Sequence, residues 1–130
     1  MKIVIPMALP SVANLREHWA TRARRTKAQR AAVVLSMCVA SRGLARLVVG
    51  VEYGARYVVT LTRVAARPLD DDNLASAFKA VRDQIAASLG TTDAPRGPLV
   101  WRYEQKRCGA KSPPWVLISI EPQGGQEVTT

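Results

Sequence analysis

The apolar positions of the N-terminal third predict a strand followed by a long helix. Residues 2–9, KIVIPMAL, are rich in Ile, Val and Leu and end at a proline, which is typical of a strand. From residue 14 or 15 to about residue 41 there is no Pro or Gly, so we expect a helix that ends at Gly43. Its first half is basic and its second half is apolar. We therefore expect one half to project toward a ligand while the other half packs into the core.

The remaining pattern predicts strands on either side of a second helix. Residues 46–65 contain two β-branched runs separated by YGA, which is typical of a hairpin or of a loop leading into one long strand over 57–64. A helix is expected over 69–90, with aspartates at its start and a glycine at its end. Two final strands, over 99–107 and 114–122, are expected to pair as a hairpin around CGAKSP.

This order of elements predicts a single α+β domain over residues 1–122. We expect a mixed β-sheet with the two main helices packed on one side of it. With 130 residues and 48% apolar positions, the chain is long enough for one modest core. Residues 123–130, QGGQEVTT, predict a disordered tail.

The apolar runs also bear on where the protein acts. None approaches the ~18 residues that a membrane span requires, and prolines break the N-terminal segment, so we expect neither a signal peptide nor a membrane partner. A cytoplasmic location is therefore expected. Cys38 and Cys108 are far apart and belong to no metal-binding motif, which indicates two free thiols.

The formal net charge of +9 points to a polyanionic partner, and nucleic acid is the leading candidate. Because many small proteins are merely cationic, the layout of the charge is more informative than its sum. Six cations fall within fifteen residues that contain a single acid: Arg16, Arg22, Arg24, Arg25, Lys27 and Arg30. All five aspartates fall in a different window: Asp70, Asp71, Asp72, Asp83 and Asp93. This segregation predicts an electropositive binding surface beside an acidic centre.

A helical wheel of the second helix separates a core face from a polar stripe. The core face is expected to hold Leu74, Ala77, Phe78, Val81, Ile85 and Leu89. The polar stripe holds Asp72, Ser76, Lys79 and Asp83. Lys79 is therefore expected on the same side of the helix as Asp72.

The three adjacent aspartates at the start of this helix, Asp70 to Asp72, allow two interpretations. In the first, one of them caps the helix and the others interact favourably with its dipole, each by ~0.3–1 kcal/mol. In the second, alternation along an extended segment turns Asp70 and Asp72 to one side as ligands of Mg²⁺ and turns Asp71 away. Asp93 offers a further carboxylate, but the helix carries it ~25 Å from Asp72 unless its loop turns back or a partner subunit completes the site. The spacing alone leaves both interpretations open.

The motif L-D-D-D-N-L, followed by K-x-x-x-D and a later acidic loop, resembles the RusA family of Holliday junction resolvases, especially its prophage-type members. The segment IPMALPSVANLREHWATRARRTKAQR is similar to the opening of that family, so the resemblance covers residues 3 to about 105. It implies a small homodimeric Mg²⁺-dependent endonuclease, with Mn²⁺ as a substitute ion, that cuts four-way DNA junctions symmetrically. The implied metal ligands are Asp70, Asp72 and Asp93, and the implied catalytic lysine is Lys79.

Two positions depart from the pattern of that family. Its lysine stands four residues after the second aspartate, where this chain has Ser76, and Lys79 comes three residues later. Its late loop usually carries two adjacent acids, whereas TTD retains only Asp93.

The resemblance further implies how DNA is bound and cut. The ion would polarise the scissile phosphate and activate a water, while Lys79 would stabilise the developing charge. The expected contacts to branched DNA are Asn14, Arg16, Arg22, Arg24, Arg25, Lys27, Arg30 and Arg67. Trp19 and His18 are candidates for stacking on an exposed base, although we expect Trp19 in the core, as is usual for a helical Trp. Two alternatives remain: a non-catalytic DNA-binding protein of the same fold, and a nuclease acting on flaps or forks.

Overall fold

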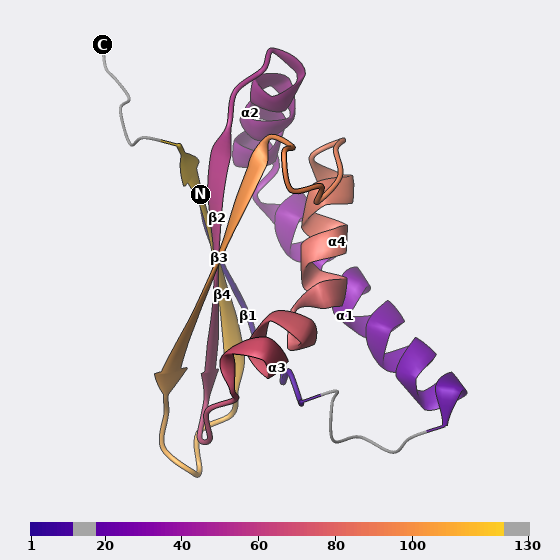
Figure 1. Ribbon diagram of the computed structural model, residues 1–130, viewed down its shortest axis with the longest axis vertical. Helices are drawn as coiled ribbons and strands as arrows, with labels where there is room; N and C mark the ends of the chain where they lie inside the picture. Colours follow the sequence, from indigo (N-terminus) through magenta and orange to yellow (C-terminus); the bar gives the residue numbers. More distant parts are fainter. Residues whose placement is uncertain (12–17, 124–130) are drawn as a thin grey trace.

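The computed structural model describes residues 1–11 and 18–123, which form four strands and four helices. In chain order these are β1 (Lys2–Ile5), α1 (Trp19–Val39), α2 (Ser41–Glu52), β2 (Tyr57–Ala65), α3 (Asp71–Ala77), α4 (Lys79–Ser88), β3 (Leu99–Arg107) and β4 (Trp115–Pro122). In Figure 1 the sheet is seen edge-on, with the helices on one side of it. The predicted α+β class and the one-sided helical layer are thus confirmed.

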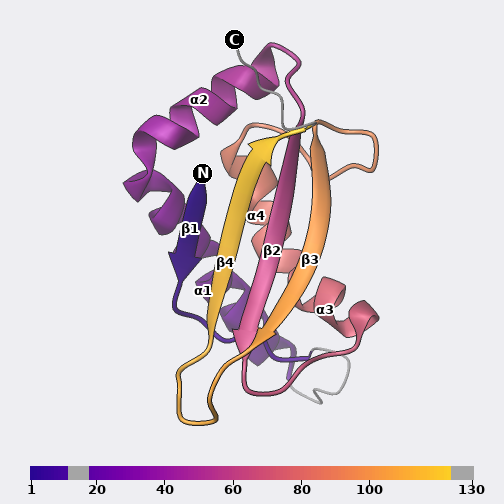
Figure 2. The same cartoon turned by 90° about the vertical axis from the view of Figure 1, so that its left-hand side faces the viewer.

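The sheet is mixed, as predicted, and its strand order is β1-β4-β2-β3 (Figure 2). β2 is central: it pairs in parallel with β3, so that Leu61 lies opposite Tyr103, and antiparallel with β4, so that Leu61 lies opposite Ile118. β1 pairs antiparallel with the other side of β4. Alternate side chains of the sheet point toward the helices and form the core with them.

The expected hairpin between β3 and β4 is wrong, because β2 lies between these two strands. β4 is an inner strand, and its Ile118 and Ile120 are 0% and 1% exposed. β3 instead exposes Arg102, Glu104 and Lys106, and charged side chains suit an edge strand because they discourage pairing with other chains.

The first β-branched run is a helix, α2, so the strand predicted within residues 46–52 is wrong. Its core-facing residues recur at the helical spacing i, i+3, i+4 and i+7, and they are Leu44, Leu47, Val48 and Val51. The residues of β2 confirm the second run as one long strand. A 3.6-residue period was therefore present in a segment whose composition favours strands.

Neither Gly43 nor Gly50 ends a helix, because both lie inside α2. The helix expected to run to Gly43 ends instead at Val39, and α2 continues from it at an angle of 99°. Gly50 is needed where it stands, since a Cβ there would lie 1.9 Å from the hydroxyl oxygen of buried Tyr57. In the described ranges no single helix is long and apolar enough to cross a membrane; α1 and α2 pass only as a bent pair.

The second predicted helix is present but divides into α3 and α4 at Phe78. Phe78 is fully buried with a ring centroid 6.0 Å from that of Tyr103, so the break seats this ring in the core. The predicted core face is confirmed in full: Leu74, Ala77, Phe78, Val81, Ile85 and Leu89 are all buried. Gly90 follows α4 with φ +76°, the left-handed conformation expected after a helix.

The two cysteines are free thiols, as predicted. Beyond β4 the backbone N–H of Gln123 still donates to the carbonyl of Arg56. The rest of the expected disordered tail, residues 124–130, lies outside the described residues.

Candidate functional site

The acidic triplet lies where the chain leaves the central strand and enters α3. Asp70 takes the N-cap position with extended backbone (φ −64°, ψ 156°), but its side chain makes no capping hydrogen bond. Asp71 and Asp72 form the first turn of the helix, where their charges face the positive end of its dipole. All three residues are exposed. The capping interpretation is therefore right about the position of Asp70 and about the interaction of the other two aspartates with the helix dipole. It is wrong about a capping hydrogen bond from the Asp70 side chain.

The alternation expected along this segment is wrong, because Asp71 and Asp72 are already helical and successive helical residues are about 100° apart. Asp71, which was expected to point away, instead borders a cavity of about 640 Å³ between α3 and β3. The cavity is lined by Asp71, Leu74, Trp101, Arg102, Tyr103 and Glu104. Glu104 thus places a second carboxylate in this cavity, and sequence spacing gave no sign of it.

Asp93, in the loop after α4, is paired with cations of α4. Its Oδ2 accepts a hydrogen bond from Nε of Arg82 at 2.9 Å. The same oxygen forms ion pairs with Nη2 of Arg82 at 2.9 Å and with Nζ of Lys79 at 3.5 Å. Partial burial raises the pKa of Asp93, but Lys79 and Arg82 outweigh this effect and hold the pKa below its ordinary value. Asp93 is consequently an ionised partner of two cations.

Lys79 lies between two carboxylates. Its Nζ donates to Oδ1 of Asp83 at 2.9 Å, one helical turn away, and this hydrogen bond raises the pKa of Lys79 above its ordinary value. The structure therefore brings together two of the predicted site residues, Lys79 and Asp93. The lysine side chain remains 61% exposed and accessible to a ligand.

Arg82 was missed by the sequence reasoning, and it connects the loop of Asp93 to the sheet. Besides Asp93, its Nη1 donates to the hydroxyl of Tyr103 at 2.6 Å, and its guanidinium carbon lies 5.7 Å from the centroid of the Trp101 ring. Burial lowers the pKa of Arg82, but Tyr103 and Asp93 outweigh this effect and raise the pKa. Arg82 follows Phe78 by four residues, so helical spacing places it beside the core face. That position was the signal in the sequence from which Arg82 could have been identified.

The predicted metal ligands do not form one group. Among residues 1–11 and 18–123, no three His, Cys, Asp or Glu side chains gather closely enough to hold a metal ion. The exposed carboxylates of Asp70 and Asp72 have the oxygen chemistry that Mg²⁺ prefers, and this ion commonly uses only one or two carboxylates with waters and phosphate oxygens. Asp70 and Asp72 therefore offer ligand atoms of the kind that Mg²⁺ takes, whereas the carboxylate of Asp93 is paired with Arg82 and Lys79.

The basic half of α1 projects away from the body of the molecule (Figure 1). The buried residues of this helix are Gln29, Val33 and Met37, so burial begins only at its midpoint and the division predicted from the sequence is confirmed. Five of the expected DNA contacts lie on this helix: Arg22, Arg24, Arg25, Lys27 and Arg30. Asn14 and Arg16 lie outside the described residues.

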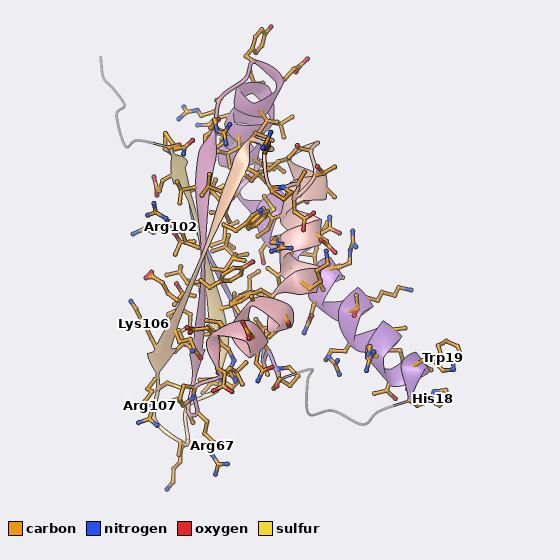
Figure 3. All side chains as sticks on the ribbon, viewed as in Figure 1. His18, Trp19, Arg67, Arg102, Lys106 and Arg107 are labelled. Atoms are coloured by element: carbon orange, nitrogen blue, oxygen red, sulfur yellow. The ribbon has the colours of Figure 1, made fainter. Side chains whose placement is uncertain are left out.

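Trp19 is not a core residue, so that prediction is wrong. Its side chain lies in the first turn of α1, at the far end of the projecting half of the helix, and is 75% exposed. His18 precedes it as N-cap, with Nδ1 accepting from the backbone N–H of Ala20 at 3.1 Å. The two rings lie 5.3 Å apart at the far end of the projection (Figure 3).

Arg67 marks a second basic area, at the end of the sheet near α3. Arg63 donates to its backbone carbonyl at 2.7 Å, which fixes the turn, while the Arg67 side chain is exposed. Arg107 pairs with Ala65 at the same ends of β2 and β3, and Figure 3 shows Arg107 and Arg67 extending there together. Cations thus flank the acidic start of α3, which follows Arg67 by three residues.

A scan against protein-family models, a search of curated proteins and a search of solved structures each found no match. We therefore infer function from the geometry of these residues and from the motif that they form.

Proposed function

We propose that this protein is a Mg²⁺-dependent endonuclease selective for branched DNA, which resolves four-way junctions in the manner of the RusA family. The observation that carries this proposal is the charge arrangement at the end of the sheet. The exposed carboxylates at the start of α3 follow exposed Arg67 by three residues in the chain, and exposed Arg107 extends at the same end of the sheet as Arg67, so a phosphate held by Arg67 would lie near the acids. Phosphodiester hydrolysis needs both charge types in one place.

In this proposal some residues position the DNA and others take part in the hydrolysis. Exposed cations of α1, with Arg67 and Arg107, bind backbone phosphates and orient the DNA without reading bases. Asp70 and Asp72 would hold Mg²⁺, which supplies polarisation of the phosphate and acidification of a bound water when present. Lys79 offers an ammonium group for the developing phosphate charge, and it must partly leave Asp83 to reach a substrate.

A homodimer is part of this proposal, because symmetric cutting of a four-way junction requires two sites related by a two-fold axis. The separation of Asp93 from the α3 acids gives the dimer a further role. A carboxylate from the partner subunit would complete a metal site that one chain leaves with only the α3 acids.

The second candidate function is non-catalytic DNA binding, and the pairing of Asp93 with Lys79 and Arg82 favours it. In such a protein this ion-pair network stabilises the fold, and α1 still binds DNA. This ion-pair network is compatible with both candidate functions, so only a measurement of nuclease activity distinguishes them.

The test is incubation of a labelled four-way junction with the protein and Mg²⁺. Wild type and Glu52→Gln, which alters an exposed acid on α2, are expected to make paired nicks, while Asp72→Asn reduces nicking at least 100-fold because it removes a metal ligand. Absence of nicks from wild type, or equal nicking by Asp72→Asn, would overturn the proposal. Binding without cleavage of any branched substrate favours the second candidate, and faster cutting of flaps or forks than of junctions reassigns the substrate.

A further inference from the structure

One side of the projecting half of α1 carries a groove with an aromatic end and a basic wall. The groove has a volume of about 510 Å³ and is lined by Trp19, Arg22, Ala23, Thr26, Lys27 and Arg30. These positions follow the helical spacing i, i+3, i+4, i+7, i+8 and i+11, so they form one stripe along the helix. At 1.5 Å per residue the stripe is about 16 Å long.

The aromatic end of the groove is open to solvent. The indole of Trp19 is 75% exposed, and an exposed aromatic ring beside cationic side chains is a platform on which a base can stack. Next to it the small side chains of Ala23 and Thr26 form the floor, which leaves space beside the ring. A flat ligand group can therefore stack on Trp19 without moving the helix.

The basic wall of the groove is available for phosphate. Lys27 is exposed, and within the described part of the chain no carboxylate lies within ion-pair distance of its Nζ. Arg30 is fixed by its Nε–H, which donates to Oε1 of Gln84 on α4 at 3.0 Å. This bond uses one of the five guanidinium N–H donors and holds the group at the inner end of the groove.

We propose that this groove binds an unpaired nucleotide of a nucleic acid, with the base stacked on Trp19 and the adjoining phosphates bound by Lys27 and Arg30. An aromatic platform beside a basic track is the general arrangement for single-stranded nucleic acid. A second copy of the chain is a poor occupant, because two such stripes would bring like charges together. A lipid surface is also a poor occupant, because Trp19 is the one large apolar side chain in the stripe.

This inference rests on the proposed nucleic-acid function but not on cleavage, so its test is a binding measurement without divalent ions. Wild type, Trp19→Ala and Trp19→Phe are titrated with a fluorescein-labelled oligothymidylate and with a labelled blunt-ended duplex, in EDTA. Tyr53→Ala is the matched control, because Tyr53 is an aromatic residue 85% exposed on the surface and outside the groove. Trp19 is exposed, so its replacement is not expected to disturb folding.

We expect Trp19→Ala to weaken oligothymidylate binding by about 5- to 100-fold, as stacking of one base would require. Trp19→Phe is expected to retain most of the affinity, and duplex binding is expected to change less than 3-fold, within the weak effect of a non-ionic contact. Tyr53→Ala is expected to match wild type. Lys27→Ala is expected to lower the salt dependence of binding to the oligothymidylate by about 0.7 in slope.

Equal losses of single-strand and duplex binding, or no loss in Trp19→Ala, would overturn the inference. So would preferential binding of wild type to anionic phosphatidylserine vesicles, with a blue shift of tryptophan emission that Trp19→Ala abolishes. A protein that passes this test but never nicks a junction keeps the groove assignment and loses the proposed nuclease function. If the protein nicks junctions but fails this binding test, the proposed nuclease function stands and the groove assignment is lost.

Discussion

Arg82 fastens the loop after α4 to the sheet, and its replacement by methionine tests whether this network stabilises the fold. The substitution removes the hydrogen bonds to Asp93 and Tyr103 and the cation contact with Trp101, while it keeps much of the apolar stem. The Arg82 and Asp93 side chains are 27% and 26% exposed, so solvent reduces the value of their ion pair to about 1 kcal/mol. With the Tyr103 bond and the Trp101 contact, we expect Arg82→Met to destabilise the protein by about 2 kcal/mol.

The assay is equilibrium unfolding in urea at pH 7. With a denaturant dependence of about 1–3 kcal/mol per M, the unfolding midpoint of Arg82→Met should fall by about 1 M relative to wild type. Arg96→Met is the control, because Arg96 is an exposed arginine in the same loop. A double-mutant cycle with Asp93→Asn should give a coupling free energy of about 1 kcal/mol between Arg82 and Asp93.

The coupling should depend on pH in one direction. Because Asp93 has a lowered pKa in the folded state, its contribution to stability is complete above the pKa of the unfolded carboxyl, about 4. That contribution is lost as the pH falls through the lower pKa of the folded state. A coupling free energy below about 0.3 kcal/mol at pH 7, or one that persists unchanged at pH 2, would refute the assigned role of the pair.

Three further substitutions test the packing and the basic arm. Phe78→Ala should cost about 3–5 kcal/mol in thermal or urea unfolding, since the ring is fully buried where α3 meets α4, and a loss below about 1 kcal/mol would contradict its central position. Gly50→Ala should destabilise by about 1–3 kcal/mol because its Cβ would meet the Tyr57 hydroxyl, and adding Tyr57→Phe should recover part of that loss. If the second substitution restores nothing, the contact is not the cause. Arg24→Ala and Lys27→Ala should each reduce the salt slope of duplex binding by about 1, measured by fluorescence anisotropy, and an unchanged slope would remove α1 from the DNA interface.

The predictions that succeeded depend on periodicity over a long segment. The core face of α3 and α4, from Leu74 to Leu89, could be read from the sequence because each residue repeats the same helical spacing. Strands β2, β3 and β4 were also placed closely, since β-branched and aromatic residues recur in them. The division of α1 into a projecting and a packed half followed from the change of composition along it.

The errors occur where local composition and tertiary packing disagree. The run RLVVGVE favours a strand by composition, but Leu47 and its neighbours at helical spacing pack on the core. This tertiary packing outweighs the local preference for a strand. Trp19 favours burial by residue type, but it lies at the far end of the projecting half of α1 and is 75% exposed. The pairing of β4 with β2 rather than with β3 depends on burial across the whole sheet.

For the candidate site, the sequence by itself determined which chemical groups are present: the acidic triplet, the basic segment, Lys79 and Asp93. It also determined that Asp70 to Asp72 begin a helix, because local spacing and capping rules act over a few residues. Only the tertiary structure decided which groups meet. It joined Asp93 to Arg82 and Lys79, placed Asp71 across a cavity from Glu104, and left Asp70 and Asp72 apart from Asp93. Contacts between residues far apart in sequence depend on how helices and strands pack, and that packing is not encoded in any one short motif.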